Sequence, residues 1–259
     1  MAKGNRGGQK ANTAVAGSGN IQPTQQATQQ TQPTQVDDTQ QAQAMSAQYD
    51  AFMQMSDDQK ADVIDSMIKQ GVPAHLADND FQKMIYNIGL NDKPQLVDDA
   101  TLDSMNGTEL FRTINNVYDS QNDISYTADQ IARQVQAGRV TRVSDNGGSV
   151  YGRGIYFADN KSDSSVYGDY HGDVKKTAQI RCKLNSNAKV ISHSKALQGV
   201  SAEKTNGSKL GKVLEKCDYD SQASIYALAK GYNVITSGHG YYNILNRNAV
   251  TMSKTINPI

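Results

Sequence analysis

The N-terminal stretch of residues 1–44 is the feature that most restricts how this chain can fold. It consists mostly of Gln, Thr, Gly, Ala, Asn and Pro and contains no aromatic residue. Such a segment cannot bury enough apolar surface to offset the entropy lost on ordering. We therefore predict a disordered arm, and the 37% of the chain that is hydrophobic is expected to form its core within residues 45–259.

The charge balance excludes a strong global electrostatic field. Lys and Arg together number 26, as do Asp and Glu, so no net charge favours nucleic acid or an acidic membrane surface. The three basic residues in the arm are too few to predict nucleic-acid binding. No run approaches the ~20 apolar residues of a membrane helix. We expect no membrane span, no nucleic-acid partner and, in the absence of other information, a cytoplasmic location.

The cysteines and histidines do not form a recognisable metal site. Cys182 and Cys217 lack the CxxC spacing of zinc ligands, and the four histidines are not paired one helical turn apart. We predict no metal and two reduced thiols that serve packing.

Residues 45–98 have the pattern of a small helical module. Ser56 and Gln59 form a capping box ahead of apolar residues at helical spacing, and Gly71 follows as a stop. Asp78 is the candidate cap of a second helix. The apolar residues of that second helix share one stripe: Phe81, Met84, Ile85 and Ile88. Both helices have one-sided apolar faces, so we expect the module to dock on the domain that follows it.

Residues 99–259 change to strands separated by Gly, Asn and Ser. The expected strands are 109–114, 154–158, 178–184, 188–192, 232–236 and 241–246. Thr127 with Gln130 predicts one helix between them, and Asp220 as a cap predicts another. The strands do not alternate regularly with helices, so the pattern predicts an α+β domain with a mainly antiparallel sheet.

The run "VYGRGIYFADNKSDSSVY" at 150–167 carries the candidate chemistry. Its Gly-x-Gly pair precedes a strand, whereas dinucleotide-binding and P-loop glycines follow one and open a helix. Judged on glycine alone, this is a hairpin loop. Tyr156 and Tyr167, however, would form a slot for a planar ring if the Ser-rich segment between them is helical, with the Ser164 hydroxyl at its edge. The alternative is that the tyrosines belong to the core.

This run resembles the nicotinamide-binding signature of the poly(ADP-ribose) polymerase branch of the ADP-ribosyltransferases. The matching positions are Gly152, Gly154, Ile155, Tyr156, Phe157, Ala158, Asp159, Ser162, Ser164 and Tyr167. The resemblance implies a split antiparallel sheet with helices and NAD as substrate. Tyr156 and Tyr167 would sandwich the nicotinamide ring, Ser164 and Gly154 would orient its carboxamide, and Phe157 and Ala158 would complete the binding segment.

The flanking strands resemble the family less closely. Arg112 and Thr113 occupy the place of the family's Arg-Gly or His-Gly pair, and an arginine there suits the NAD pyrophosphate. Thr113 replaces the glycine, and an ordinary ion pair is the alternative for Arg112. Tyr241 stands where the family has its catalytic glutamate, and loss of one such electrostatic contact typically lowers the rate ~10²- to 10³-fold. The catalytic candidates are therefore Arg112, Tyr156 and Tyr241.

Two functions follow from these residues. The first is NAD binding with mono-ADP-ribosyl transfer to an unidentified protein acceptor and release of nicotinamide. The second is a catalytically degenerate binding or structural protein, such as a virion-associated component of a phage, because the order of arm, helical module and domain resembles phage proteins. In that case the location would be the virion or the host cytoplasm. The ring slot favours the first function, and Tyr241 favours the second.

Overall fold

The computed structural model describes residues 49–72, 79–88, 93–119, 124–138, 153–164 and 177–259. The chain divides into two compact units, Met1–Val36 and Asp37–Ile259, and every described residue belongs to the second. The predicted arm at 1–44 lies outside the described residues, as do Asp78, Gly152 and Tyr167.

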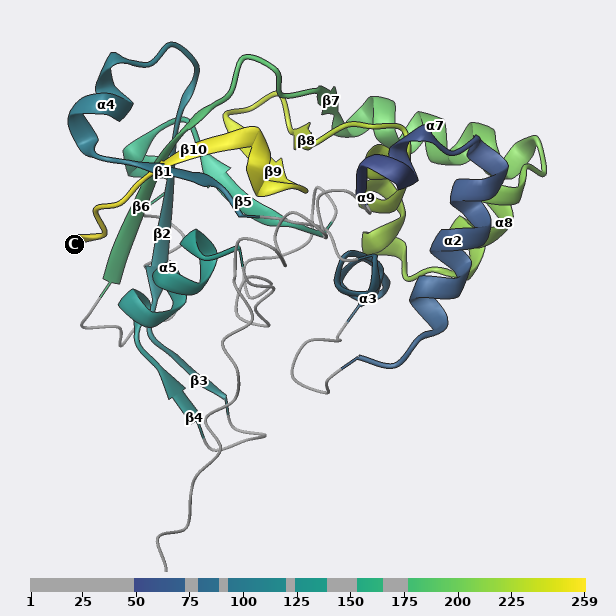
Figure 1. The fold of residues 1–259 in the computed structure, drawn as a ribbon, viewed down its shortest axis with the longest axis horizontal. Helices are drawn as coiled ribbons and strands as arrows, with labels where there is room; N and C mark the ends of the chain where they lie inside the picture. Colours follow the sequence, from purple (N-terminus) through teal and green to yellow (C-terminus); the bar gives the residue numbers. More distant parts are fainter. Residues whose placement is uncertain (1–48, 73–78, 89–92, 120–123, 139–152, 165–176) are drawn as a thin grey trace, which may run out of the picture. The chain divides into compact units, whose positions relative to one another are not determined.

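A mixed sheet forms the first part of the fold (Figure 1). Its strands are β1 (Gln95–Val97), β2 (Glu109–Asn115), β5 (Ile155–Ala158), β6 (Thr177–Leu184), β7 (Val190–Ser192), β8 (Val234–Thr236), β9 (Tyr241–Ile244), β10 (Val250–Ser253) and β11 (Asn257–Pro258). The order is β1-β10-β6-β2-β5-β9-β8-β7, with β11 against β6. The pairs β1–β10 and β7–β8 are parallel, and the other pairs described in this sheet are antiparallel. The predicted strands are therefore present in a mainly antiparallel sheet, and the parallel pairs at its two ends were not predicted.

Helices form the second part of the fold. They are α2 (Asp57–Lys69), α3 (Asp80–Asn87), α4 (Asp99–Ser104), α5 (Ala128–Gln136), α7 (His193–Thr205), α8 (Lys209–Lys216) and α9 (Tyr219–Ala229), with a 3₁₀ turn η3 (Arg247–Ala249). Helix α5 packs on β2 and β6. Helix α2 packs with α8, and α3 packs with α9. A separate hairpin pairs β3 (Val117–Asp119) with β4 (Ile124–Tyr126). The protein is thus a mixed α/β structure.

Two of the predicted helix starts are confirmed. Ser56 and Gln59 make the reciprocal bonds of a capping box at the start of α2, and Thr127 and Gln130 do the same at α5. These signals act over three residues, so the local sequence is sufficient to fix them. Gly71 follows the C-cap of α2 as predicted, but it does not have a left-handed backbone.

Two other helix starts differ from the prediction. The N-cap of α3 is Asn79, which accepts a hydrogen bond from the Gln82 amide at 2.8 Å. Helix α9 is capped by Asp218, not Asp220. Both aspartates suit a cap, but the Asp218 carboxylate also accepts the amide of Asp80 from α3. Docking of α3 therefore selects the earlier start.

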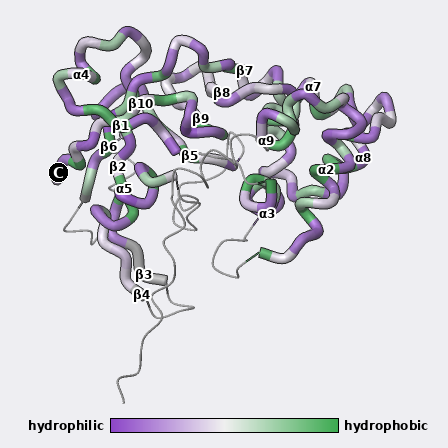
Figure 2. Tube along the Cα trace, in the orientation of Figure 1, coloured by the Kyte–Doolittle hydropathy of each residue, from purple (hydrophilic) through white to green (hydrophobic). Residues whose placement is uncertain are grey.

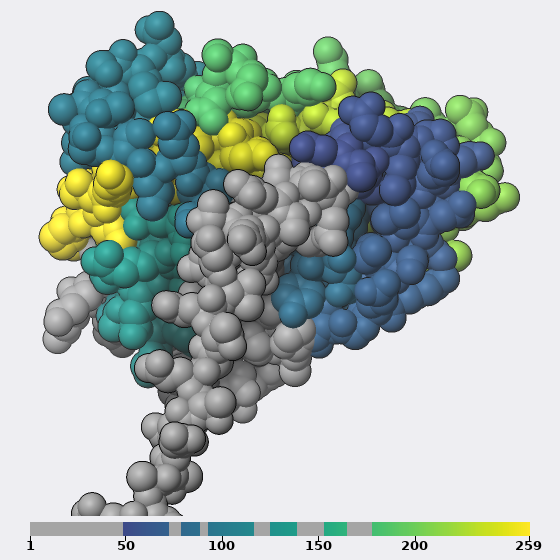
Figure 3. Space-filling view, viewed as in Figure 1, coloured from purple at the N-terminus to yellow at the C-terminus, as the bar shows by residue number. Residues whose placement is uncertain are grey.

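The helices and the sheet each enclose a hydrophobic cluster. The helical cluster combines side chains of α2 and α3 with those of α7, α8 and α9, together with Ile191 of β7 and Ile235 of β8. The sheet cluster lies between the strands and α5. Figure 3 shows the surface of α2 beside that of α8. Residues of the predicted helical module (45–98) therefore share a hydrophobic core with residues of the predicted domain (99–259). Strand β1, which also lies within 45–98, belongs to the large sheet formed mainly by residues of that domain.

Hydrophobic residues are distributed in short patches along both the sheet and the helices (Figure 2). Within the described ranges, no helix combines the length and the apolar character that a bilayer crossing requires.

Candidate functional site

The three strands that carry the predicted site residues are neighbours in the sheet. Strand β5 pairs with β2 on one side and with β9 on the other. Ala158 lies opposite both Phe111 of β2 and Tyr241 of β9, and Tyr156 lies opposite Asn243. Directly opposed residues share a face of a sheet. The fold therefore brings Tyr156, Ala158 and Tyr241 to one face.

The other face of β5 belongs to the core. Ile155 and Phe157 are buried in the sheet cluster with Ile244 of β9. Side chains alternate between faces along a strand, so Phe157 is separated from the face of Tyr156. The Phe157 ring serves packing, and a contact of this residue with a ligand would have to come from its backbone. Tyr156, by contrast, is partly exposed.

Gly154 directly precedes β5 and lies close to β9. Its φ is +154°, and a Cβ placed there would lie 2.0 Å from Oδ1 of Asn243 and 3.0 Å from the carbonyl oxygen of Ile244. Only glycine leaves room for this contact. In the structure this space is filled by the buried Asn243 side chain, and the predicted contact of Gly154 with the nicotinamide carboxamide stays a prediction.

A pair of hydroxyl groups lies between β2 and the segment that follows β5. The Oγ1 of Thr113 is 2.9 Å from the Oγ of Ser164, and Ser164 is only 1% exposed. Residues 161–164 are helical, as predicted for the Ser-rich segment, and Asn160 accepts the Ser162 amide at 2.9 Å. Thr113 and Ser164, two of the predicted site residues, are thus hydrogen-bonded to each other.

Arg112 connects β2 to β5 through a backbone group. Its Nη1 donates to the carbonyl oxygen of Tyr156 at 2.8 Å. A charged donor makes a stronger bond than a neutral one, so this contact fixes β5 next to the candidate site. Arg112 lies opposite Ile180 of β6, on the core face of β2, so the structure does not bring its side chain to the face of Tyr156 and Tyr241. Its predicted contact with the NAD pyrophosphate stays a prediction.

Tyr241 begins β9 immediately after a tight turn. Gly238 and Gly240 adopt φ of +78° and +81°, which most side chains disfavour. The Ser237 amide donates to the Tyr241 carbonyl at 3.0 Å, and the Asp159 amide donates to the Gly240 carbonyl at 2.9 Å. These bonds fix the backbone of Tyr241 against the end of β5, and the Tyr241 side chain is partly exposed.

The glutamates Glu203 and Glu215, which precede β9 in the chain, lie on helices. Glu203 of α7 accepts from the Ser208 hydroxyl and pairs with Lys230 at 2.8 Å. Burial acts to raise the pKa of Glu203, but the contacts with Lys230 and Ser208 together outweigh it and lower the pKa. Glu215 of α8 is exposed. Asp159 lies nearer to Tyr241, since its Oδ1 would be 2.6 Å from a Cβ on Gly240.

The two cysteines are buried thiols in the described structure. Burial raises the pKa of Cys217 to about 12 and that of Cys182 still further. Among the residues that the structure describes, no group of His, Cys, Asp and Glu is arranged to hold a metal ion.

Sequence reasoning missed three residues around Gly154. Asn243 was assigned only to a strand, Ser224 only to a helix, and Arg153 was the variable position between the two glycines. Their roles depend on contacts across more than 70 positions of the chain. The pattern of one strand or one helix contains no signal for such contacts.

No family model, curated protein or solved structure matches this chain.

Proposed function

We propose that this protein binds NAD in an ADP-ribosyltransferase-like site formed by β2, β5 and β9. The observation that carries the proposal is the adjacency of these three strands. The nicotinamide-binding signature, the candidate arginine and the position of the missing glutamate are far apart in the sequence, yet they lie on neighbouring strands. A chance resemblance over residues 152–167 would not require this arrangement.

The residues present fit the chemistry of the nicotinamide end of NAD. Tyr156 is partly exposed on the shared face and offers a ring for stacking. The Ser164 hydroxyl can bond a carboxamide once a movement of the chain exposes it, because in this structure it is buried against Thr113. The predicted partner ring, Tyr167, lies outside the described residues.

The reaction that we propose is mono-ADP-ribosyl transfer. The bond between the ribose C1′ and the nicotinamide nitrogen breaks, a nucleophile of a protein acceptor bonds to C1′, and the acceptor's proton is released to solvent. Tyr241 supplies a neutral phenol where the family has a carboxylate, so slow turnover is expected. Chain growth to poly(ADP-ribose) is not proposed.

Tyr241 also supports a second candidate, an NAD-binding or structural protein without turnover. The two functions differ in one measurable property, which is whether nicotinamide is released.

The first experiment measures NAD affinity by calorimetry and nicotinamide release by chromatography over several hours. Tyr156→Ala removes the ring, and Tyr156→Phe is the matched control because it keeps the ring. We expect about fivefold weaker binding in the alanine variant, corresponding to about 1 kcal/mol of lost stacking, and little change in the phenylalanine variant. Equal affinities in folded Tyr156→Ala and wild type would exclude the ring slot.

A second variant tests the glutamate position. Tyr241→Glu restores the carboxylate, and we expect nicotinamide release to rise by ~10²-fold or more if Tyr241 occupies the catalytic place. Binding without release in the wild type, followed by release in this variant, would identify a degenerate enzyme. No release from either protein would remove the transferase and leave the binding function.

A further inference from the structure

The segment ahead of Gly154 is held by helix α9. The amide of Arg153 donates to the Asp220 carbonyl at 3.1 Å. The Arg153 carbonyl accepts from Ser224 Oγ at 2.6 Å and from Asn243 Nδ2 at 3.2 Å. Both backbone polar groups of this one residue are therefore bound by α9 and β9, directly before the glycine of the candidate site.

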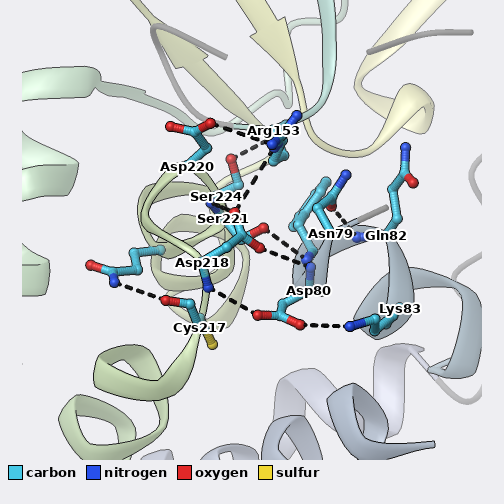
Figure 4. Close-up of polar contacts among 12 residues, drawn as sticks. Asn79, Asp80, Gln82, Lys83, Arg153, Cys217, Asp218, Asp220, Ser221 and Ser224 are labelled. Atoms are coloured by element: carbon cyan, nitrogen blue, oxygen red, sulfur yellow. Dashed lines mark hydrogen bonds and ion pairs between the residues drawn. The ribbon is translucent and has the colours of Figure 1, made fainter. Parts of the chain in front are cut away.

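The Arg153 side chain reinforces this attachment. Its Nη2 lies 3.3 Å from Oδ2 of Asp220, and its Nε lies 4.0 Å from Oδ1 of Asp218. The first distance is an ion pair, whereas the second is too long for a hydrogen bond and contributes only electrostatic attraction. The Arg153 side chain is 23% exposed. Figure 4 shows the guanidinium beside the first turn of α9.

The same turn of α9 is attached to α3 on its other side. The Asp80 amide donates to Asp218 Oδ2 at 3.0 Å, and the Asp218 amide donates to Asp80 Oδ2 at 2.9 Å. The Phe81 amide donates to Ser221 Oγ at 3.0 Å. Ser221 and Ser224 thus project from one helix to two different partners: Ser221 binds α3, and Ser224 binds the Arg153 carbonyl (Figure 4).

We propose that Arg153 and Ser224 are positioning residues of the candidate NAD site. They hold the backbone ahead of β5 against α9, and this contact fixes where Gly154 and Tyr156 lie relative to β9. The predicted effect of these two residues on NAD affinity rests on the proposed function. The structural part of the inference, that Ser224 stabilises the backbone of 154–156, does not depend on any ligand.

Ser224→Ala and Ser221→Ala are a matched pair for the test. Both serines are fully buried in α9, and each substitution removes one hydroxyl. The experiment measures NAD affinity by calorimetry, hydrogen–deuterium exchange of the amides of residues 154–156 without NAD, and the unfolding midpoint in urea. We expect about fivefold weaker NAD binding and faster exchange at 154–156 in Ser224→Ala. In Ser221→Ala we expect a similar loss of stability with both site properties unchanged.

Each outcome decides the inference. Equal changes of affinity and exchange in the two variants would indicate general loosening and overturn it, as would no change in Ser224→Ala. Absence of NAD binding in the wild type would refute the proposed function, and the exchange at 154–156 would then decide the structural part alone. Should Ser224→Ala not fold, Asp220→Asn weakens the Arg153 ion pair without removing a buried group, and faster exchange at 154–156 is again the expected result.

Discussion

Substitution of Gly154 by alanine tests the close approach of β5 and β9. A Cβ at this position would lie 2.0 Å from Oδ1 and 2.9 Å from Cγ of Asn243, and 3.0 Å from the carbonyl oxygen of Ile244. The backbone of Ile244 belongs to β9, so the strand cannot move without loss of pairing. The Asn243 side chain must therefore shift.

The expected cost has two parts. A φ of +154° is rarely adopted by alanine, and such a conformation costs ~1 to 3 kcal/mol. Displacement of Asn243 breaks its bond to the Arg153 carbonyl and leaves a buried amide poorly paired, which costs ~1 to 3 kcal/mol. We expect the free energy of unfolding to fall by about 3 kcal/mol, which lowers Tm by about 6 to 12 °C for a domain of this size.

Thermal and urea unfolding followed by circular dichroism measure this loss. Gly207→Ala is the matched control, because Gly207 has φ of +62° and nothing within 4 Å of an added Cβ. It carries only the backbone cost of about 1 kcal/mol. If Gly154→Ala is no more destabilising than Gly207→Ala, the predicted clash is wrong. Asn243→Ser in the Gly154→Ala background should recover part of the stability, because the shorter side chain leaves room for the methyl group.

Two further predictions concern charged residues. Lys230→Met removes the ion pairs with Glu203 and Asp57 from a lysine that is 22% exposed, and we expect a loss of about 1 to 2 kcal/mol. Lys209→Met breaks an exposed pair and should leave the urea midpoint nearly unchanged; equal urea midpoints for the two variants would contradict this. The hydrogen bond from Ser253 is the main cause that holds the pKa of Asp99 below its usual value. The ionised Asp99 carboxylate therefore stabilises the folded protein above about pH 4, and this stabilisation is lost as the pH falls through the folded pKa. Asp99→Asn should therefore flatten the decline of the urea midpoint between about pH 5 and pH 3, and an unchanged slope would show that other carboxylates cause the decline.

Part of the candidate site was predictable because its signals are local. The strand at Ile155–Ala158 and the helical turn at 161–164 follow from residue types within a few positions. The capping boxes at Ser56 and Thr127 act over three residues. In each case the interacting groups are close in the chain, so the sequence alone specifies the contact.

Helices α7 and α8 were not among the predicted helices, and each contains a glycine. In the fold, a Cβ at Gly199 of α7 would lie 2.1 Å from the ring of Tyr226, and one at Gly211 of α8 would lie 2.2 Å from the backbone oxygen of Glu203. At Gly211 the neighbour is backbone, so glycine permits the close packing of α8 on α7, whereas at Gly199 the Tyr226 ring would have to move for a larger residue. The local cost of glycine in a helix, about 1 kcal/mol relative to alanine, is offset by contacts that only the folded chain makes.

The sequence by itself determined which segments form most strands, where α2 and α5 begin, and which residues resemble a nicotinamide site. The tertiary structure decided that β2, β5 and β9 are neighbours, that Phe157 faces the core while Tyr156 does not, and that Arg153 is bound by α9. It also decided between Asp218 and Asp220 as the cap of α9. The physical reason is the range of the interactions: a cap or a strand pattern joins residues a few positions apart, whereas the order of strands depends on contacts between residues far apart in the chain.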